Sequence, residues 1–236
     1  RRAAARAAGQ GGGVVFLVDE FFRGDAGLPA RLGLQPGDAL QFVETADEPK
    51  TDGIDAVVAD LHARGLARPA ALVGLGGGIT MDTAKSVSNL LTNGGRAADY
   101  QGWDLVRVPG IFKIGIPSIS GTGAEATRTC VMTNPHNGLK LGMNSDHTVF
   151  DHVIMDPELT ATVPRDQYFH TGMDAYIHCI ESLGGSYRNA IGDAYSRETI
   201  NLCRQVFGPG DMMAPDRREQ LMVAAYLGGC AIATSY

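Results

Sequence analysis

Short apolar runs alternate with amphipathic stretches in the first half of the chain. The apolar runs predict buried strands at residues 14–18, 39–44, 71–73 and 113–116. The stretches between them predict helices at residues 54–64 and 79–91; the first carries Ile54, Val57, Val58 and Leu61 on one face. Strands and helices in this alternating order are typical of a parallel α/β sheet.

The pattern changes near Pro164, after which no segment predicts a strand. Helical patterns follow at residues 175–183, 190–207 and 217–234. The sequence therefore predicts an α/β domain over residues 1–162 and the start of an all-helical domain over residues 163–236. The chain begins with Arg1, and its last apolar run reaches Tyr236 without a helix-ending signal, so we expect a truncated helical domain and a longer natural protein.

Composition narrows the classes of function. The net charge of −6 argues against nucleic-acid binding, which needs a basic face. The sequence has no uninterrupted apolar run of about 18 residues, so we expect no membrane association. Four widely spaced cysteines form no CxxC pair, which favours reduced thiols in a cytoplasmic protein; they are Cys130, Cys179, Cys203 and Cys230.

A glycine run lies where the third predicted strand meets the next helix. It comprises Gly76, Gly77 and Gly78, with Asp82 and Lys85 in the first turns of the helix. Glycines let backbone N–H groups approach a phosphate, and the helix N-terminus adds partial positive charge. The run is neither a GxGxxG fingerprint nor a P-loop, and glycine is common here, so a plain turn stays open as the alternative.

Two further polar segments follow predicted strands. Asp19 could accept both ribose hydroxyls of a dinucleotide and repel a 2′-phosphate, but taken alone the residue favours the alternative, a solvated acid at a strand end. Ser118, Ser120 and Thr122 could hydrogen-bond a pyrophosphate or a ribose, and the alternative is a turn with a helix cap.

An acid and an imidazole four residues apart suggest a metal site. Asp174 and His178 share one face of a predicted helix, and this pair suits Zn²⁺ or Fe²⁺. Asp166 and His170 have the same spacing, so spacing cannot choose between the two pairs. A catalytic metal site also needs at least three protein ligands, so either pair would be incomplete.

Four motifs together resemble the iron-containing alcohol dehydrogenase family, with its dehydroquinate synthase-like fold. They are GLGGGITMDTAKSVSNLL, IPSISGTGAEATRTCVMTN, MDPELTATVPRDQ and TGMDAYIHCIES, in the family's order, and the resemblance covers roughly residues 14–236. It implies a Rossmann-like α/β domain followed by an all-α domain. It also implies that NAD is bound by Gly76, Gly77, Gly78, Asp82, Ser118, Ser120, Thr122 and Lys140.

The resemblance decides the metal pair. It implies that Asp174 and His178 are the first two ligands of a divalent Fe²⁺ or Zn²⁺ ion, rather than Asp166 and His170. Two more histidine ligands would follow beyond Tyr236, so the fragment alone is expected to be inactive. With Asp19 at the ribose, NAD is favoured over NADP. No catalytic residue beyond the metal ligands is assigned.

The resemblance implies hydride transfer from a primary alcohol to nicotinamide, in a homo-oligomer such as a dimer acting on a small alcohol or sugar acid. Three segments are similar to a branch that oxidises the C8 hydroxyl of 3-deoxy-D-manno-octulosonate in lipopolysaccharide biosynthesis, where oxygen could replace NAD; they are SGTGAEATRTCVMTN, LKLGMNSDHTV and RNAIGD. The alternatives are a glycerol dehydrogenase, a dehydroquinate synthase-like lyase and a non-catalytic nucleotide-binding or assembly protein.

Overall fold

The computed structural model describes residues 12–235, which form two compact units. Of the described residues, unit 1 contains residues 12–115 together with Arg128–Val153, and unit 2 contains Ile116–Thr127 together with residues 154–235. The division differs from the expected single boundary at residue 162. Ile116–Thr127 belongs with the helices because its glycines pack directly against them, as described below.

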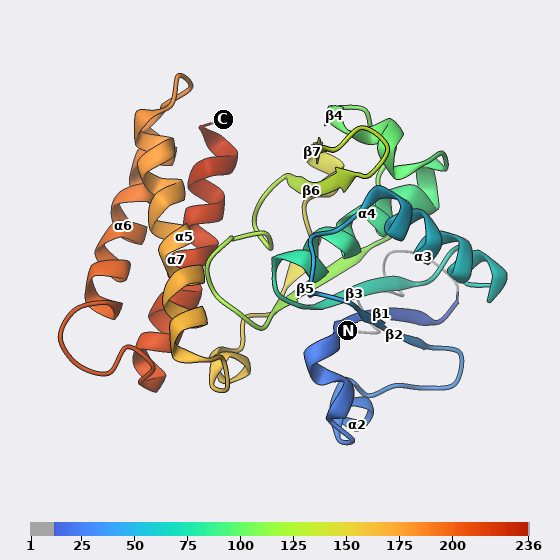
Figure 1. Ribbon diagram of the computed structural model, residues 1–236, viewed down its shortest axis with the longest axis horizontal. Helices are drawn as coiled ribbons and strands as arrows, with labels where there is room; N and C mark the ends of the chain where they lie inside the picture. The colour runs from blue at the N-terminus through green and yellow to red at the C-terminus, as the bar shows by residue number, and fades with distance from the viewer. Residues whose placement is uncertain (1–11, 236) are drawn as a thin grey trace. The chain divides into compact units, whose positions relative to one another are not determined.

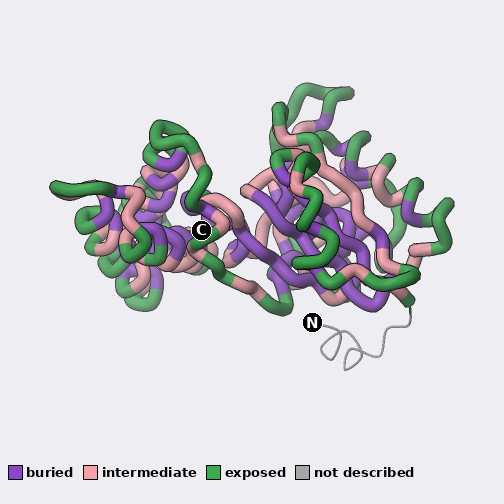
Figure 2. Tube along the Cα trace, turned by 90° about the horizontal axis from the view of Figure 1, so that it is seen from below, coloured by how far each residue is buried: buried purple, intermediate pink, exposed green. Residues whose placement is uncertain are grey.

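Unit 1 is built around a parallel sheet with strand order β2-β1-β3-β5-β8 (Figure 1). The strands are β1 (Val14–Asp19), β2 (Ala39–Val43), β3 (Ala71–Gly76), β5 (Lys113–Pro117) and β8 (His152–Val153). All residues of β3 and β5 are buried, which Figure 2 shows as purple segments inside this unit. The predicted parallel α/β sheet is therefore confirmed.

Helices cover both faces of this sheet. Figure 1 shows α3 (Thr51–Ala63) and α4 (Gly78–Asn93) on one face and the short α2 (Leu28–Leu32) on the other. Helix α4 packs against β3 and β1, and eleven of its sixteen residues are buried. Short 3₁₀ turns complete the connections: η1 (Glu20–Gly24), η2 (Ala97–Tyr100), η3 (Asp146–Thr148) and, in unit 2, η4 (Pro157–Thr160).

A second, smaller sheet lies against α4 and was not predicted from the sequence. It has the order β4-β7-β6, with β6 (Thr129–Asn134) and β7 (Leu139–Asn144) antiparallel and β4 (Gly102–Trp103) beside β7. The sequence signal was present: Asn137-Gly138 is a strong hairpin turn, and Gly138 has φ +71°. Leu139, Leu141 and Met143 alternate with other residues after the turn, as a strand requires.

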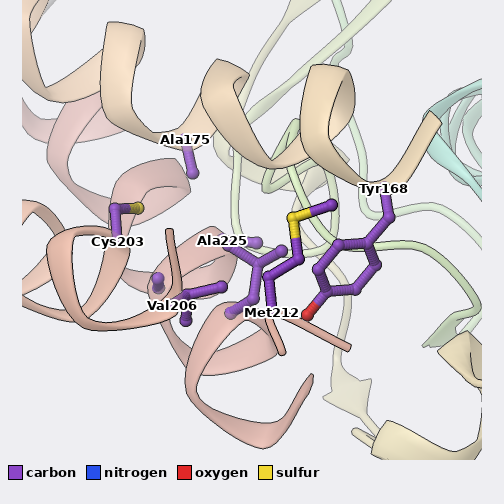
Figure 3. Packing of buried hydrophobic residues seen from close by; sticks show 8 residues of the cluster. Tyr168, Ala175, Cys203, Val206, Met212 and Ala225 are labelled. Carbon is purple, nitrogen blue, oxygen red and sulfur yellow. The ribbon is translucent and has the colours of Figure 1, made fainter. Parts of the chain in front are cut away.

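Unit 2 consists mainly of α5 (Arg165–Gly184), α6 (Ala190–Val206) and α7 (Pro215–Thr234), which pack on one another. The predicted helices are confirmed, although α5 begins ten residues before the expected start at residue 175. Their shared core contains Tyr168 and Ala175 from α5, Cys203 and Val206 from α6, and Ala225 from α7 (Figure 3). Among residues 12–235, no helix combines the length and apolar character needed to cross a bilayer.

Candidate functional site

The glycine run forms the turn between β3 and α4, at the carboxyl end of the parallel sheet. Gly77 is the N-cap in an extended conformation, and no side chain caps the helix that starts at Gly78. A Cβ atom on Gly76 would lie 2.5 Å from Thr80 Oγ1 and 2.9 Å from Asp19 Cβ. Gly76 therefore has a packing role, and the uncapped helix end offers backbone N–H groups to an anion.

Thr80 adds an unsatisfied donor beside this turn. Its side chain is fully buried, and its Oγ1 atom has no hydrogen-bond partner in the described part of the chain. A buried hydroxyl normally has a partner, so an unpaired one next to an uncapped helix end fits a site that a polar ligand completes.

Asp19 is half-buried at the end of β1. Its Oδ1 atom accepts hydrogen bonds from Phe21 N and Thr45 Oγ1, both at 3.0 Å. Both hydrogen bonds go to Oδ1, and within residues 12–235 Oδ2 accepts no hydrogen bond. One carboxylate oxygen therefore remains for a ligand hydroxyl. Thr45, which orients the carboxylate, was missed in the sequence because it follows β2, far along the chain.

Asp82 and Lys85 attach the first turns of α4 to the neighbouring strand β6. Asp82 Oδ2 accepts from Val131 N at 2.9 Å, and Lys85 Nζ donates to Thr129 O at 2.8 Å. Burial raises the pKa of Asp82 to about 6, although the Lys85 charge opposes this shift. Both side chains thus have a structural task, and Asp82 remains only a proposed cofactor contact.

Lys140 extends from β7 and forms an ion pair with Glu48, which also accepts a hydrogen bond from Thr133 Oγ1. Lys140 faces Thr133 in the hairpin register, two residues along β6 from Val131, whose N–H donates to Asp82 in the first turns of α4. The sequence singled out neither Glu48 nor Thr133. Glu48 lies in a polar stretch without a motif, and Thr133 lies at the end of a quoted motif that gave it no role. Only the folded chain brings both to Lys140.

The Ser/Thr–Gly turn belongs to unit 2. Ser120 is buried and its Oγ atom has no partner among the described residues, whereas Ser118 is half-buried. Thr122 is exposed, and its Oγ1 atom accepts from Ala124 N at 3.2 Å. A Ser hydroxyl without a partner keeps a donor for a ligand, while Thr122 already has the turn-capping role that the alternative interpretation expected.

Glycines hold this turn against the helices of unit 2. A Cβ on Gly121 would lie 1.9 Å from the carbonyl oxygen of Thr171 in α5. Gly123 has φ +62°, and a Cβ there would lie 2.5 Å from Ala225 O and 2.6 Å from Gly229 Cα in α7. The hydroxyl-bearing turn is therefore positioned directly by α5 and α7.

Asp174 and His178 approach each other on α5. Asp174 Oδ1 lies 3.9 Å from His178 Nε2, and their side chains are 41% and 22% exposed. The buried His178 Nδ1 has no hydrogen-bond partner among the described residues. Asp166 and His170 are both exposed, so their environment is less suited to hold an ion. Over residues 12–235, no three His, Cys, Asp or Glu side chains cluster as a metal site would require.

The predicted residues therefore gather in two sets. Asp19, the glycine turn, Asp82 and Lys140 lie in unit 1. Ser118, Ser120, Thr122, Asp174 and His178 lie in unit 2. The first set offers amides, a carboxylate and a cation for a nucleotide, and the second offers hydroxyls and two metal-ligating groups.

The sequence profile described as "Iron-containing alcohol dehydrogenase" matches residues 3–157. The chain is 35% identical to sulfoacetaldehyde reductase of Bilophila wadsworthia over 192 residues, which is 80% of this chain and 48% of that protein. It is 32% identical to NAD-dependent methanol dehydrogenase of Bacillus methanolicus over 163 residues, covering 68% of this chain and 43% of that protein.

The fold agrees with solved structures. Sulfoacetaldehyde reductase from Bifidobacterium kashiwanohense, solved in complex with NAD⁺, matches with a TM-score of 0.81 and 26% identity, over 98% of this chain and 61% of that one. The expected α/β domain followed by helices is thereby confirmed. The chain spans about half the length of the curated relatives it matches.

Proposed function

Because the chain belongs to the iron-containing alcohol dehydrogenase family, we propose that the protein interconverts a small primary alcohol and its aldehyde by hydride transfer to and from a nicotinamide dinucleotide. The observation that carries this proposal is the Asp174–His178 pair, half-buried on α5 with 3.9 Å between Oδ1 and Nε2. Both side chains are partly exposed, Asp174 at 41% and His178 at 22%.

We propose NAD as the dinucleotide, bound by residues of unit 1. The uncapped amides at Gly77 and Gly78 would hold the pyrophosphate, and the second oxygen of Asp19 would accept the ribose hydroxyls. The Asp19 charge would repel the 2′-phosphate of NADP. A solved relative that contains NAD⁺ supports this choice.

We propose that Asp174 and His178 hold part of a divalent metal site, with iron the first candidate and zinc the second. A carboxylate oxygen and an imidazole nitrogen on one helix face fit such an ion, and the remaining ligands would come from elsewhere in the complete protein. A bound ion would activate the alcohol hydroxyl as a Lewis acid, and nicotinamide would accept the hydride. Residues of this chain would orient the alcohol and the nicotinamide.

The substrate is proposed only as a class. Relatives of this chain act on methanol and on sulfoacetaldehyde, as their names state, which favours short alcohols and aldehydes. The C8 hydroxyl of 3-deoxy-D-manno-octulosonate is a finer candidate that rests on three sequence segments alone. Glycerol oxidation and lyase chemistry are the remaining candidates. A panel of the alcohols followed by NADH absorbance separates the oxidations, whereas a lyase would consume its substrate without net formation of NADH.

The metal proposal is tested with two pairs of variants on one helix. We expect His178→Gln and Asp174→Asn to weaken Zn²⁺ or Fe²⁺ binding by at least roughly tenfold, because each removes a ligand. His170→Gln and Asp166→Asn are the matched controls, because they make the same substitutions at the same spacing in exposed positions. They should leave the affinity for the metal ion unchanged. The measurement is metal titration by calorimetry, with bound metal counted by mass spectrometry after dialysis. Equal loss in both pairs would overturn the assignment.

A further inference from the structure

The Glu48 carboxylate, between β2 and α3, contacts both members of one cross-strand pair in the β6–β7 hairpin. One oxygen accepts from Thr133 Oγ1, and the other pairs with Lys140 Nζ. Thr133 and Lys140 face each other in the hairpin register. A single carboxylate therefore binds the Thr133 hydroxyl on β6 and the Lys140 ammonium on β7.

Main-chain contacts of the residues that follow Glu48 fix its position. Thr133 N donates to Pro49 O at 2.8 Å, and Lys50 forms a parallel bridge with Thr133. The loop that carries Glu48 is thus docked along the free edge of β6. The Lys140 and Thr133 contacts lower the pKa of Glu48, so the carboxylate is ionised at neutral pH.

This ion pair lies near the nucleotide-binding end of α4 while remaining accessible to a ligand. The Val131 N–H, two residues before Thr133 on β6, donates to Asp82 in the first turns of α4. The charge of Lys140 also acts on Asp82. The Lys140 side chain is 58% exposed and that of Glu48 is 33% exposed.

We infer that Glu48 tunes the affinity for the dinucleotide by competing with it for Lys140. The inference rests on the proposed function, which gives Lys140 a contact with an anionic cofactor. In the structure the ammonium is already neutralised by Glu48, so an incoming pyrophosphate must break that ion pair. The carboxylate also repels the pyrophosphate directly. Glu48 therefore lowers affinity for the dinucleotide and favours its release.

The test replaces Glu48 by Gln, which keeps the shape and an oxygen acceptor for Thr133 but removes the charge. We expect E48Q to bind NAD roughly two- to fivefold more tightly than the wild type, as measured by calorimetry at low salt. The gain should shrink as NaCl rises from about 20 to about 500 mM, because salt screens exposed charges. The gain in NAD affinity should also shrink in the K140M background, because Glu48 then has no Lys140 ammonium to neutralise.

Asp60→Asn is the matched control, because Asp60 pairs with Arg64 at 2.9 Å on α3 and the substitution removes the same charge from the same unit. Affinity for NAD that is unchanged or weaker in E48Q would overturn the inference, as would an equal gain in D60N. Glu48→Ala provides a second variant should E48Q misfold by circular dichroism. Failure of the wild type and all variants to bind NAD would overturn the proposed dinucleotide site itself, and this inference with it.

Discussion

Asp82 is a half-buried carboxylate in the first turns of α4, and its environment has a measurable thermodynamic effect. Burial raises its pKa to about 6, while Lys85 and the Val131 N–H partly compensate. The unfolded chain titrates this group at its ordinary value of 3.8. The folded state therefore binds this proton more strongly than the unfolded state, and ionising Asp82 opposes folding.

The sign of the pH dependence follows from this difference. Below pH 3.8 both states are protonated, and above pH 6 both are ionised, so stability falls as the pH rises between these values. We expect wild type to lose about 3 kcal/mol relative to Asp82→Asn over this interval. Asn keeps an acceptor for Val131 and does not titrate. Urea unfolding at several pH values measures the free energy of unfolding of both proteins. If this free energy changed with pH in the same way in both, the expectation would be contradicted.

Burial also raises the pKa of cysteine thiols in this chain, and there it lowers their reactivity. All four are free thiols, as the absence of a CxxC pair predicted. Burial raises the pKa of Cys130 and of Cys203 to about 12. Because the thiolate is the reactive form, burial makes these two thiols poor nucleophiles at neutral pH.

At the scale of elements, the turn at residues 116–127 depends on close contacts that only glycine permits. Gly121 packs on the main chain of α5, and Gly123 and Gly229 pack on each other. A side chain at any of these positions would displace backbone rather than a flexible group. The hydroxyls of Ser118 and Ser120 are thus placed by helix packing and not by the turn alone.

Gly121→Ala tests this dependence. Its Cβ would lie 1.9 Å from Thr171 O, so we expect a loss of about 2–4 kcal/mol in the free energy of unfolding. Gly184→Ala is the matched control in the same unit, because a Cβ there meets nothing within 4 Å. The control should be neutral or slightly stabilising, since alanine loses less chain entropy. Urea unfolding measures both, and similar midpoints would show that the turn is not clamped as described.

At the scale of the whole molecule, each unit carries a different part of the proposed chemistry. Unit 1 has the amides, Asp19 and Lys140 for the nucleotide, and unit 2 has the turn hydroxyls and the Asp174–His178 pair. A ligand that binds only the folded protein stabilises it by mass action. Nucleotide binding should therefore be visible as a change in stability even without turnover.

We expect NAD at about one hundred times its Kd to stabilise the protein by about 2.7 kcal/mol. NADP at the same concentration should stabilise it less, because the Asp19 carboxylate would repel the 2′-phosphate. Thermal unfolding with each nucleotide checks the expectation. Asp19→Asn should narrow the difference between the two, and equal stabilisation of the wild type by both would contradict the role of Asp19.

The sequence by itself determined the parallel α/β sheet, the three long helices and the family, because these depend on local periodicity and on the order of motifs along the chain. Helical spacing, a local property, offered both Asp174–His178 and Asp166–His170, and the resemblance to the family chose the first pair. Only the tertiary structure decided that the Ser118–Thr122 turn belongs with the helices and that Glu48 and Thr133 meet Lys140. The Glu48–Lys140 contact joins residues 92 positions apart, and the Gly123–Gly229 contact joins residues 106 positions apart. The energies of such contacts depend on distances that no local pattern encodes.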